Sequence, residues 1–161
     1  MSRFHIREAH LPDDKPAILE FMFALQRFEA AFEANRRLDA RMPQDHYAAI
    51  IPRAAAPNGQ IFIADDAESH PVGWALIHEE VDDVYVNDVE RRFGFIAELY
   101  VVEAERSAGV GRALIAACET WAQARGLSTV RIGVLARNAR AAQVYDRAGY
   151  APYVLHLRKR L

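Results

Sequence analysis

The chain has 161 residues, of which 52% are hydrophobic and 26% are charged, and its formal net charge is −2. This profile is typical of one globular domain over residues 1–161, and the single cysteine, Cys118, allows no internal disulfide. The sequence has no apolar run of about 18 residues and no general excess of basic residues, which argues against a membrane span and against a nucleic-acid binder. The first residues lack the apolar stretch of a secretory signal, so we expect a cytoplasmic protein.

The first half of the chain alternates strand and helix patterns. Residues 5–8 are typical of a strand, and a helix of about five turns then has one apolar stripe, formed by Ile18, Phe21, Met22, Leu25, Phe28 and Phe32. Residues 44–51 indicate a second, short helix that ends before Pro52. A turn at residues 57–59 precedes two strand patterns, residues 60–65 and 72–78, which most simply form an antiparallel pair.

The next stretch, residues 79–92, is acidic and harder to assign. Its acidic residues occur without lysine or arginine between them: Glu79, Glu80, Asp82, Asp83, Asp88 and Glu90. Both extended strands and an exposed loop fit this pattern. Such a stretch is usually a solvated loop, although its potential could also attract a cationic molecule.

A strand, a glycine-containing loop and a helix follow in direct succession. The apolar run at residues 95–102 leads through Arg-Ser-Ala-Gly-Val-Gly, residues 106–111, into a helical pattern that starts at Arg112 and stops near Gly126. The first turn of a helix has unpaired N–H groups and the positive end of the helix dipole, so it favours a phosphate. Two glycines before a helix are also ordinary turn chemistry.

A second strand and helix complete a β-α-β order. Residues 129–135 are typical of a strand, a short helix from Asn138 to Gly149 carries Tyr145, and residues 153–157 are typical of a last strand. Strands without a helix between them should be antiparallel, whereas the helix from Arg112 should connect two parallel strands. We therefore expect an α/β (α+β mixed) fold with a central mixed, mostly antiparallel sheet and helices on both faces.

The segment from Phe95 to Tyr150 resembles the GNAT superfamily of N-acetyltransferases, which transfer an acetyl group from acetyl-CoA to an amine. Both family patterns occur at their usual separation: the Q/R-x-x-G-x-G/A loop and N-x-x-A-x-x-x-Y-x-x-x-G-[FY]. Before residue 95 only the order of elements agrees. The resemblance implies a bulge in the strand before the glycine loop, which splays from its parallel neighbour and admits the pantetheine arm. It is also compatible with a homodimer.

The resemblance assigns the donor site to two segments and one cap. The backbone of Leu99, Tyr100 and Val101 would pair with the pantetheine arm. The pyrophosphate would be wrapped by the loop residues Arg106, Ser107, Ala108, Gly109, Val110, Gly111 and Arg112. Ser107 and Ala108 stand where basic residues or glycine are frequent in the family, which removes charge but not loop geometry. Asn138 is typical of a helix cap and would also contact the pantetheine part.

Two proton transfers define the catalytic candidates. By the resemblance, Tyr145 protonates the departing thiolate, a role that suits a phenol with a pKa of about 10, and core packing is the alternative. The acceptor amine must lose a proton, because an alkylammonium with a pKa of about 10.4 is charged at pH 7. Glu98 is the candidate base, with a polar residue on a partly solvated sheet face as the alternative. Other enzymes of the family place a glutamate five residues before the asparagine, and that position is Gly133 here. Tyr100, Glu29 and a water chain therefore remain alternatives for the base.

The expected function is acetyl-CoA-dependent N-acetylation of a primary amine by direct attack on the thioester. A small amine or amino-acid derivative is favoured, because Phe21, Phe28, Phe32 and the acidic stretch could enclose a modest pocket. Protein N-termini, lysine side chains and a non-catalytic acyl-CoA-binding module are the alternatives. Six histidines without metal-ligand spacing indicate no metal site.

Overall fold

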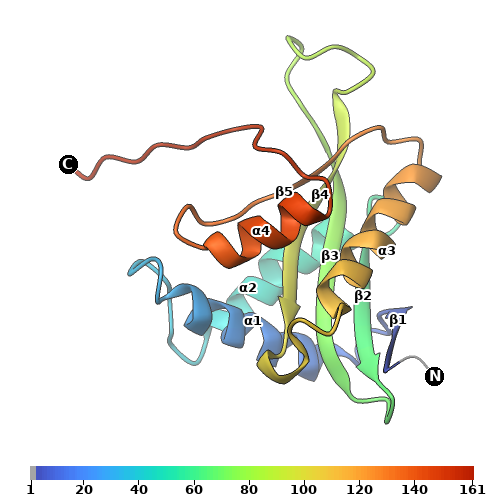
Figure 1. Cartoon of the computed structure of the whole chain (residues 1–161), viewed down its shortest axis with the longest axis vertical. Coiled ribbons are helices and arrows are strands. Elements are labelled where there is room, and N and C mark those ends of the chain that lie inside the picture. Colours follow the sequence, from blue (N-terminus) through green and yellow to red (C-terminus); the bar gives the residue numbers. More distant parts are fainter. Residues whose placement is uncertain (1–2) are drawn as a thin grey trace.

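The computed structural model describes residues 3–161, in which one sheet lies between two layers of helices (Figure 1). The elements in chain order are β1 (Phe4–Glu8), α1 (Lys15–Glu29), α2 (Met42–Ile50), η1 (Ile51–Ala54), β2 (Gly59–Asp66), β3 (Pro71–Val81), β4 (Arg92–Val101), η2 (Glu103–Glu105), α3 (Val110–Ala124), β5 (Val130–Ile132) and α4 (Ala139–Arg147). Among these described helices, none has the length and apolar character needed to cross a membrane.

The sheet has the order β1-β2-β3-β4-β5. The first four strands pair antiparallel with their neighbours, and β5 pairs parallel to β4. The strands β2, β3 and β4 follow each other along the chain and are also neighbours in space, whereas α3 forms the crossover to β5. The predicted mixed, mostly antiparallel sheet is therefore confirmed.

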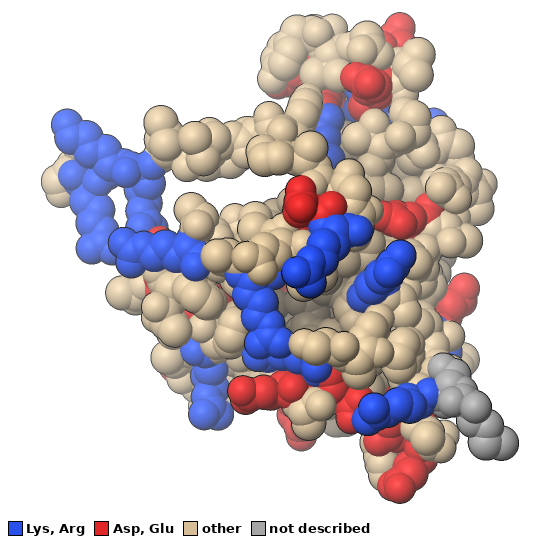
Figure 2. Space-filling model, viewed as in Figure 1, with Lys and Arg blue, Asp and Glu red and all other residues tan. Residues whose placement is uncertain are grey.

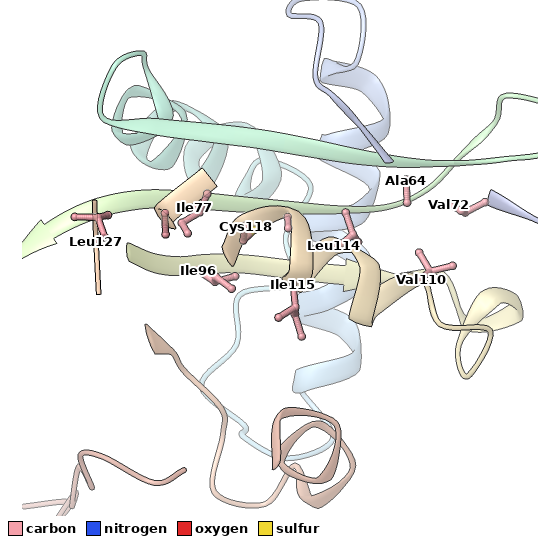
Figure 3. Packing of buried hydrophobic residues seen from close by; sticks show 11 residues of the cluster. Ala64, Val72, Ile77, Ile96, Val110, Leu114, Ile115, Cys118 and Leu127 are labelled. Atoms are coloured by element: carbon pink, nitrogen blue, oxygen red, sulfur yellow. The ribbon is translucent and has the colours of Figure 1, made fainter. Parts of the chain in front are cut away.

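Each face of the sheet has its own apolar core. The buried stripe of α3 includes Leu114, Ile115 and Cys118, which pack against Ile77 and Ile96 of the sheet (Figure 3). Burial raises the pKa of the Cys118 thiol, as expected of a small core residue rather than a reactive thiol.

On the opposite face, α1 and α2 cover the sheet around the fully buried Trp74. Ile18 and Met22 of α1 and Leu76 of β3 pack in the same cluster. Helices therefore lie on both faces, as predicted, because α1 and α3 each present one apolar stripe to the sheet.

β4 contains a bulge next to the predicted site. Glu98 lies opposite Leu76 of β3, whereas Ile96 lies opposite the next residue, Ile77, so Ala97 is the extra residue on β4. β5 pairs with β4 only from Gly94 to Ile96. Beyond that point β4 continues to Val101 without a strand on this side, as far as the described residues show. The bulge and the splayed strands that the family resemblance implied are both present.

Two expectations about individual elements need correction. The strand expected at residues 153–157 does not form, because residues 151–161 have no regular secondary structure and no strand beside them. The helix expected to reach Phe32 ends at Glu29. Between residues 79 and 92 both expected forms occur, since β3 runs to Val81, β4 begins at Arg92, and an exposed loop joins them.

Candidate active site

The glycine loop joins β4 to α3 in a conformation that suits an anion. Gly109 is the N-cap of α3 with φ of 94°, and Ser107 also has a positive φ, 71°. Such angles are easy for glycine and strained for other residues. Glycine has no side-chain oxygen to accept from the first-turn amides, so the N–H groups of Val110, Gly111 and Arg112 are available to a ligand.

A second helix supplies positive charge beside this loop. Arg140 of α4 donates from Nη2 to Ser107 Oγ at 3.3 Å, and Arg112 lies exposed in the first turn of α3. Lys and Arg side chains gather around a hollow on this face of the molecule (Figure 2). Sequence reasoning missed Arg140, although its place two residues after Asn138 puts it in the first turn of the helix next to the loop.

The side chain of Arg106 points away from the glycine loop, toward β4 and α1. Its Nε donates to the carbonyl oxygen of Val101 at 3.0 Å. Its guanidinium lies over the rings of Phe28 and Tyr100, 4.7 and 5.6 Å from their centroids. Arg106 therefore fastens the end of β4 to α1, and its N–H donates to the carbonyl oxygen of Glu103 at 3.2 Å, so neither its charge nor its N–H is directed to the predicted phosphate role.

The predicted pantetheine segment lies in the splayed half of β4. Leu99 and Val101 pack against the core under α3, whereas the Tyr100 ring lies on the other face, 5.7 Å from the Phe21 ring. All three residues follow the last pairing of β4 with β5 at Ile96. An extended ligand can therefore pair with this backbone, apart from the Val101 carbonyl that already accepts from Arg106.

Glu98 is buried and bonded to a histidine. Only 7% of Glu98 is exposed, and its Oε1 lies 2.5 Å from Nε2 of His46 on α2. This bond raises the pKa of His46 above its ordinary 6.5, because the carboxylate favours the imidazolium more than burial opposes it. The alternative of a partly solvated Glu98 is wrong. Sequence reasoning missed His46, because 52 positions separate the pair and no motif spans them.

The pKa values of Glu29 and Tyr145 are both raised. The Glu29 carboxylate is 2.9 Å from Nε of Arg36, yet burial raises the pKa of Glu29, and the charge of Glu98 adds to the increase. Burial, followed by the charge of Glu29, raises the pKa of Tyr145 to about 12. The charge of Glu98 on β4 thus acts on Glu29 of α1, and the charge of Glu29 acts on Tyr145 of α4.

Tyr145 lies on α4, whose N-terminus is capped by Asn138. The side-chain oxygen of Asn138 accepts from the N–H of Ala141 at 3.2 Å, which confirms the predicted cap. The Tyr145 ring packs against the core under α3 and lies 6.4 Å from the ring of Tyr150, whose hydroxyl donates to Glu119 at 3.0 Å. Tyr145 therefore packs in the core, and a capped helix holds it there.

A groove of about 320 Å³ lies against α1 and α2. It is lined by Gln26 of α1, Arg37, and three residues of α2, Met42, Asp45 and His46. The acidic loop between β3 and β4 does not line it and lies at the other end of β4 from the glycine loop (Figure 1). The acidic stretch therefore does not enclose this groove, contrary to the expected pocket.

Comparison with known proteins points to one family. Residues 20–150 match the model of the acetyltransferase (GNAT) family. The chain is 37% identical over 73 residues to an aminoglycoside N(6')-acetyltransferase type 1 from Stenotrophomonas maltophilia. This match covers 45% of the chain and 46% of the relative, so it spans about half of each protein.

Solved structures resemble the whole chain. A tetramutant of the BH1408 protein from Bacillus halodurans superposes with a TM-score of 0.81 at 18% identity, over 98% of this chain and 99% of that one. AAC(6')-Iy in complex with a bisubstrate analog superposes with a TM-score of 0.67 at 22% identity, over 99% and 100% of the two chains. These likenesses show a shared fold. Because the family model also covers most of the sequence, the chain belongs to the GNAT family of acetyltransferases.

Proposed function

We propose that this protein is an acetyl-CoA-dependent N-acetyltransferase in which a primary amine attacks the thioester directly. The observation that carries the proposal is the buried Glu98–His46 pair beside the splayed half of β4, with the glycine loop at the end of the same strand. In this proposal the proton acceptor and the donor site share one strand. GNAT membership and the CoA-linked ligand of the AAC(6')-Iy structure support the same chemistry.

The proposed donor site is formed mainly by backbone groups of the glycine loop, α3 and β4. The pyrophosphate of acetyl-CoA would bind the first-turn amides of α3, with Arg112 and Arg140 adding positive charge. The pantetheine arm would pair with β4 over residues 99–101, and Asn138 would contact it from the start of α4. Most of these contacts are backbone N–H and C=O groups, so the departures at Ser107 and Ala108 do not weaken the proposed geometry.

The acceptor amine has to lose its proton before it attacks. An ammonium with a pKa of about 10.4 is about 3.4 units from neutral pH, which corresponds to about 4.6 kcal/mol. In the proposed reaction the first proton passes to the His46–Glu98 pair, the amine nitrogen bonds to the acetyl carbon, and the C–S bond breaks. The nitrogen then loses its second proton and the thiolate gains one, so that the products are the amide and the free thiol. The pair accepts the first proton most readily when His46 is neutral, that is, above the raised pKa of His46.

Tyr145 would act on the departing sulfur. Its pKa of about 12 keeps the phenol protonated at any pH at which the enzyme works. Full transfer of that proton to a thiolate is uphill, since a thiol has a pKa of about 8.5. Tyr145 therefore stabilises the developing negative charge first as a hydrogen-bond donor, and the thiolate takes a proton as it leaves.

The groove favours a small polar acceptor. Four of its five lining side chains are polar or charged, and His46 connects it to Glu98. We propose small polar amines as the substrate class, with amino sugars to be tested first because the partly matching relative is named for aminoglycosides. A screen of amino sugars, amino acids and peptides with acetyl-CoA should release free thiol with the first class. Release with peptides alone would place the acceptor among proteins. Acetyl-CoA binding without any release would favour the non-catalytic module.

Glu98→Gln should shift the pH dependence of turnover. The acid limb of kcat is expected to move to lower pH and the plateau to fall about 100-fold. The carboxylate raises the pKa of His46, so without it His46 is neutral at lower pH but is a weaker base. Profiles between about pH 5 and pH 9 at saturating substrates measure both changes.

Two further variants make this test specific. His46→Gln should also alter the acid limb, whereas His70→Gln should not, because His70 pairs with Asp66 at 3.5 Å in the turn after β2, outside the site. An acid limb that is the same in wild type, Glu98→Gln and His46→Gln would exclude the pair as the base. A changed profile in Glu29→Gln would then identify Glu29 instead.

A further inference from the structure

The side chain of Arg106 contacts aromatic rings and a backbone carbonyl instead of a carboxylate. Its guanidinium lies 4.7 Å from the centroid of the Phe28 ring and 5.6 Å from that of Tyr100, and its Nε donates to Val101. Two acidic residues lie in η2, directly before Arg106, yet neither pairs with it among the described residues. A cation over a ring is attracted to the negative face of that ring, so Arg106 joins α1, which carries Phe28, to the end of β4.

The last turns of α1 depend on this contact because the core holds only the first half of the helix. No buried side chain lies beyond the middle of α1, and the buried ones are Ile18, Phe21 and Met22. From residue 23 to Glu29 every side chain is at least partly exposed, and the end of β4 lies beside the helix (Figure 1). A segment with few buried contacts opens more easily than the core, so one added contact strongly affects where it lies.

The two elements that Arg106 joins belong to the two proposed substrate sites. Gln26, in the last turns of α1, lines the groove proposed for the acceptor. Tyr100 lies in the segment of β4 proposed to pair with the pantetheine arm. We propose that Arg106 is a positioning residue, which acts through Phe28 and Tyr100 and sets how far the acceptor lies from the thioester. This inference rests on the proposed function of the protein.

Direct attack makes the reaction sensitive to this separation. The nitrogen and the carbonyl carbon react when they are about 3–3.5 Å apart, and an error of about 1 Å costs about 100-fold in rate. Movement of α1 relative to β4 changes this separation without removing any group that transfers a proton. Arg106 itself touches neither proposed substrate, since its N–H donates to Glu103 and its side chain is directed toward α1. Loss of the contact should therefore lower kcat and leave the affinity for acetyl-CoA unchanged.

Arginine suits this contact better than lysine. A planar guanidinium can lie over a ring and donate from Nε in its own plane, whereas a lysine ammonium is a compact charge on a flexible stem. Arg106→Lys keeps the charge near the rings and loses the bond to Val101, whereas Arg106→Gln loses both contacts. The kcat of Arg106→Lys should therefore lie between those of wild type and Arg106→Gln.

The first test compares kcat with donor affinity in Arg106→Gln, using acetyl-CoA and the amine that the wild type acetylates best. We expect kcat to fall about 10- to 100-fold, and the Kd for acetyl-CoA, measured by calorimetry, to stay within about twofold. A contact that served folding alone would lower Tm and leave kcat unchanged at a temperature well below Tm. An unchanged kcat, or a Kd that rises as much as kcat falls, would overturn the positioning role.

A double-mutant cycle tests whether Arg106 acts through Phe28. Phe28→Leu should lower kcat to a similar extent, and Arg106→Gln/Phe28→Leu should lower it little further, because either change breaks the same contact. The matched control is Arg27→Gln/Phe23→Leu. The Arg27 guanidinium lies 5.9 Å from the centroid of the Phe23 ring, but both residues belong to α1, so this pair does not join the helix to β4. Losses that multiply in the cycle, or an equal loss in the control, would contradict the proposal.

Hydrogen exchange tests the contact without any turnover. Amides of residues 23–29 should exchange about fivefold faster in Arg106→Gln than in wild type, and faster than in Arg27→Gln. Equal exchange in wild type and Arg106→Gln would overturn the inference. A wild type that released no thiol with any amine would overturn the proposed function instead, and the exchange rates would still decide whether Arg106 holds α1 to β4.

Discussion

Gly109→Glu is expected to abolish acetyl-CoA binding, with an increase of at least about 100-fold in the dissociation constant. The new carboxylate would stand at the N-cap of α3, where the pyrophosphate is proposed to bind. Two like charges about 4 Å apart repel by about 4 kcal/mol at an effective dielectric constant of about 20. That alone corresponds to roughly a thousandfold loss of affinity. Isothermal titration calorimetry with acetyl-CoA measures the change directly.

A glycine at the other end of the same helix provides the control. Gly126 also has a positive φ, 72°, and the space beside its Cα is open, as it nearly is at Gly109, where an added Cβ would come only within 3.9 Å of Phe4. Both substitutions therefore impose the backbone strain of a left-handed non-glycine residue, about 1–2 kcal/mol. Gly126→Glu should lower stability similarly but leave the acetyl-CoA affinity unchanged. Equal affinity in both variants would refute the loop as the phosphate site.

Tyr145→Phe is expected to lower kcat by about 100- to 10,000-fold, the range typical of losing a positioned proton donor. Phenylalanine keeps the ring that packs against the core under α3 and removes only the hydroxyl. Acetyl-CoA affinity should therefore stay within about twofold, since the proposed role concerns the leaving sulfur in the transition state. Single-turnover kinetics together with calorimetry separate the two quantities.

The neighbouring Tyr150 allows the same chemical change outside the proposed role. Its hydroxyl donates to Glu119, so Tyr150→Phe should cost about 1 kcal/mol of stability and leave kcat nearly unchanged. If Tyr145→Phe and Tyr150→Phe had the same kcat as wild type, Tyr145 would be a packing residue and the sulfur would be protonated by another group or by water.

The proposed donor side of the site could be inferred from sequence because its parts are close together along the chain. The strand at β4, the glycine loop and the start of α3 are consecutive, and their geometry depends on local chemistry such as a left-handed Gly109 and a helix terminus. The cap at Asn138 is local in the same sense. The alternation and helical periodicity of the apolar residues likewise determined the mixed sheet and its two helical layers.

The acceptor side could not be predicted in this way. His46 meets Glu98 only because α2 packs on the face of the sheet toward which Glu98 points, and the bulge at Ala97 sets which way that is. The strand pattern at residues 153–157 shows a similar limit, because a strand requires a partner that alternation alone does not specify.

The sequence by itself therefore determined the family and the fold class, and it predicted the loop proposed to bind a phosphate. The tertiary structure decided how Glu98, the proposed base, is paired, which side chain of the glycine loop points away, and whether the last segment joins the sheet of its own chain. The physical reason is the separation along the chain over which each interaction acts. Capping, turn geometry and periodic burial act within a few residues, whereas ion pairing, desolvation and strand partnership depend on segments tens of residues apart.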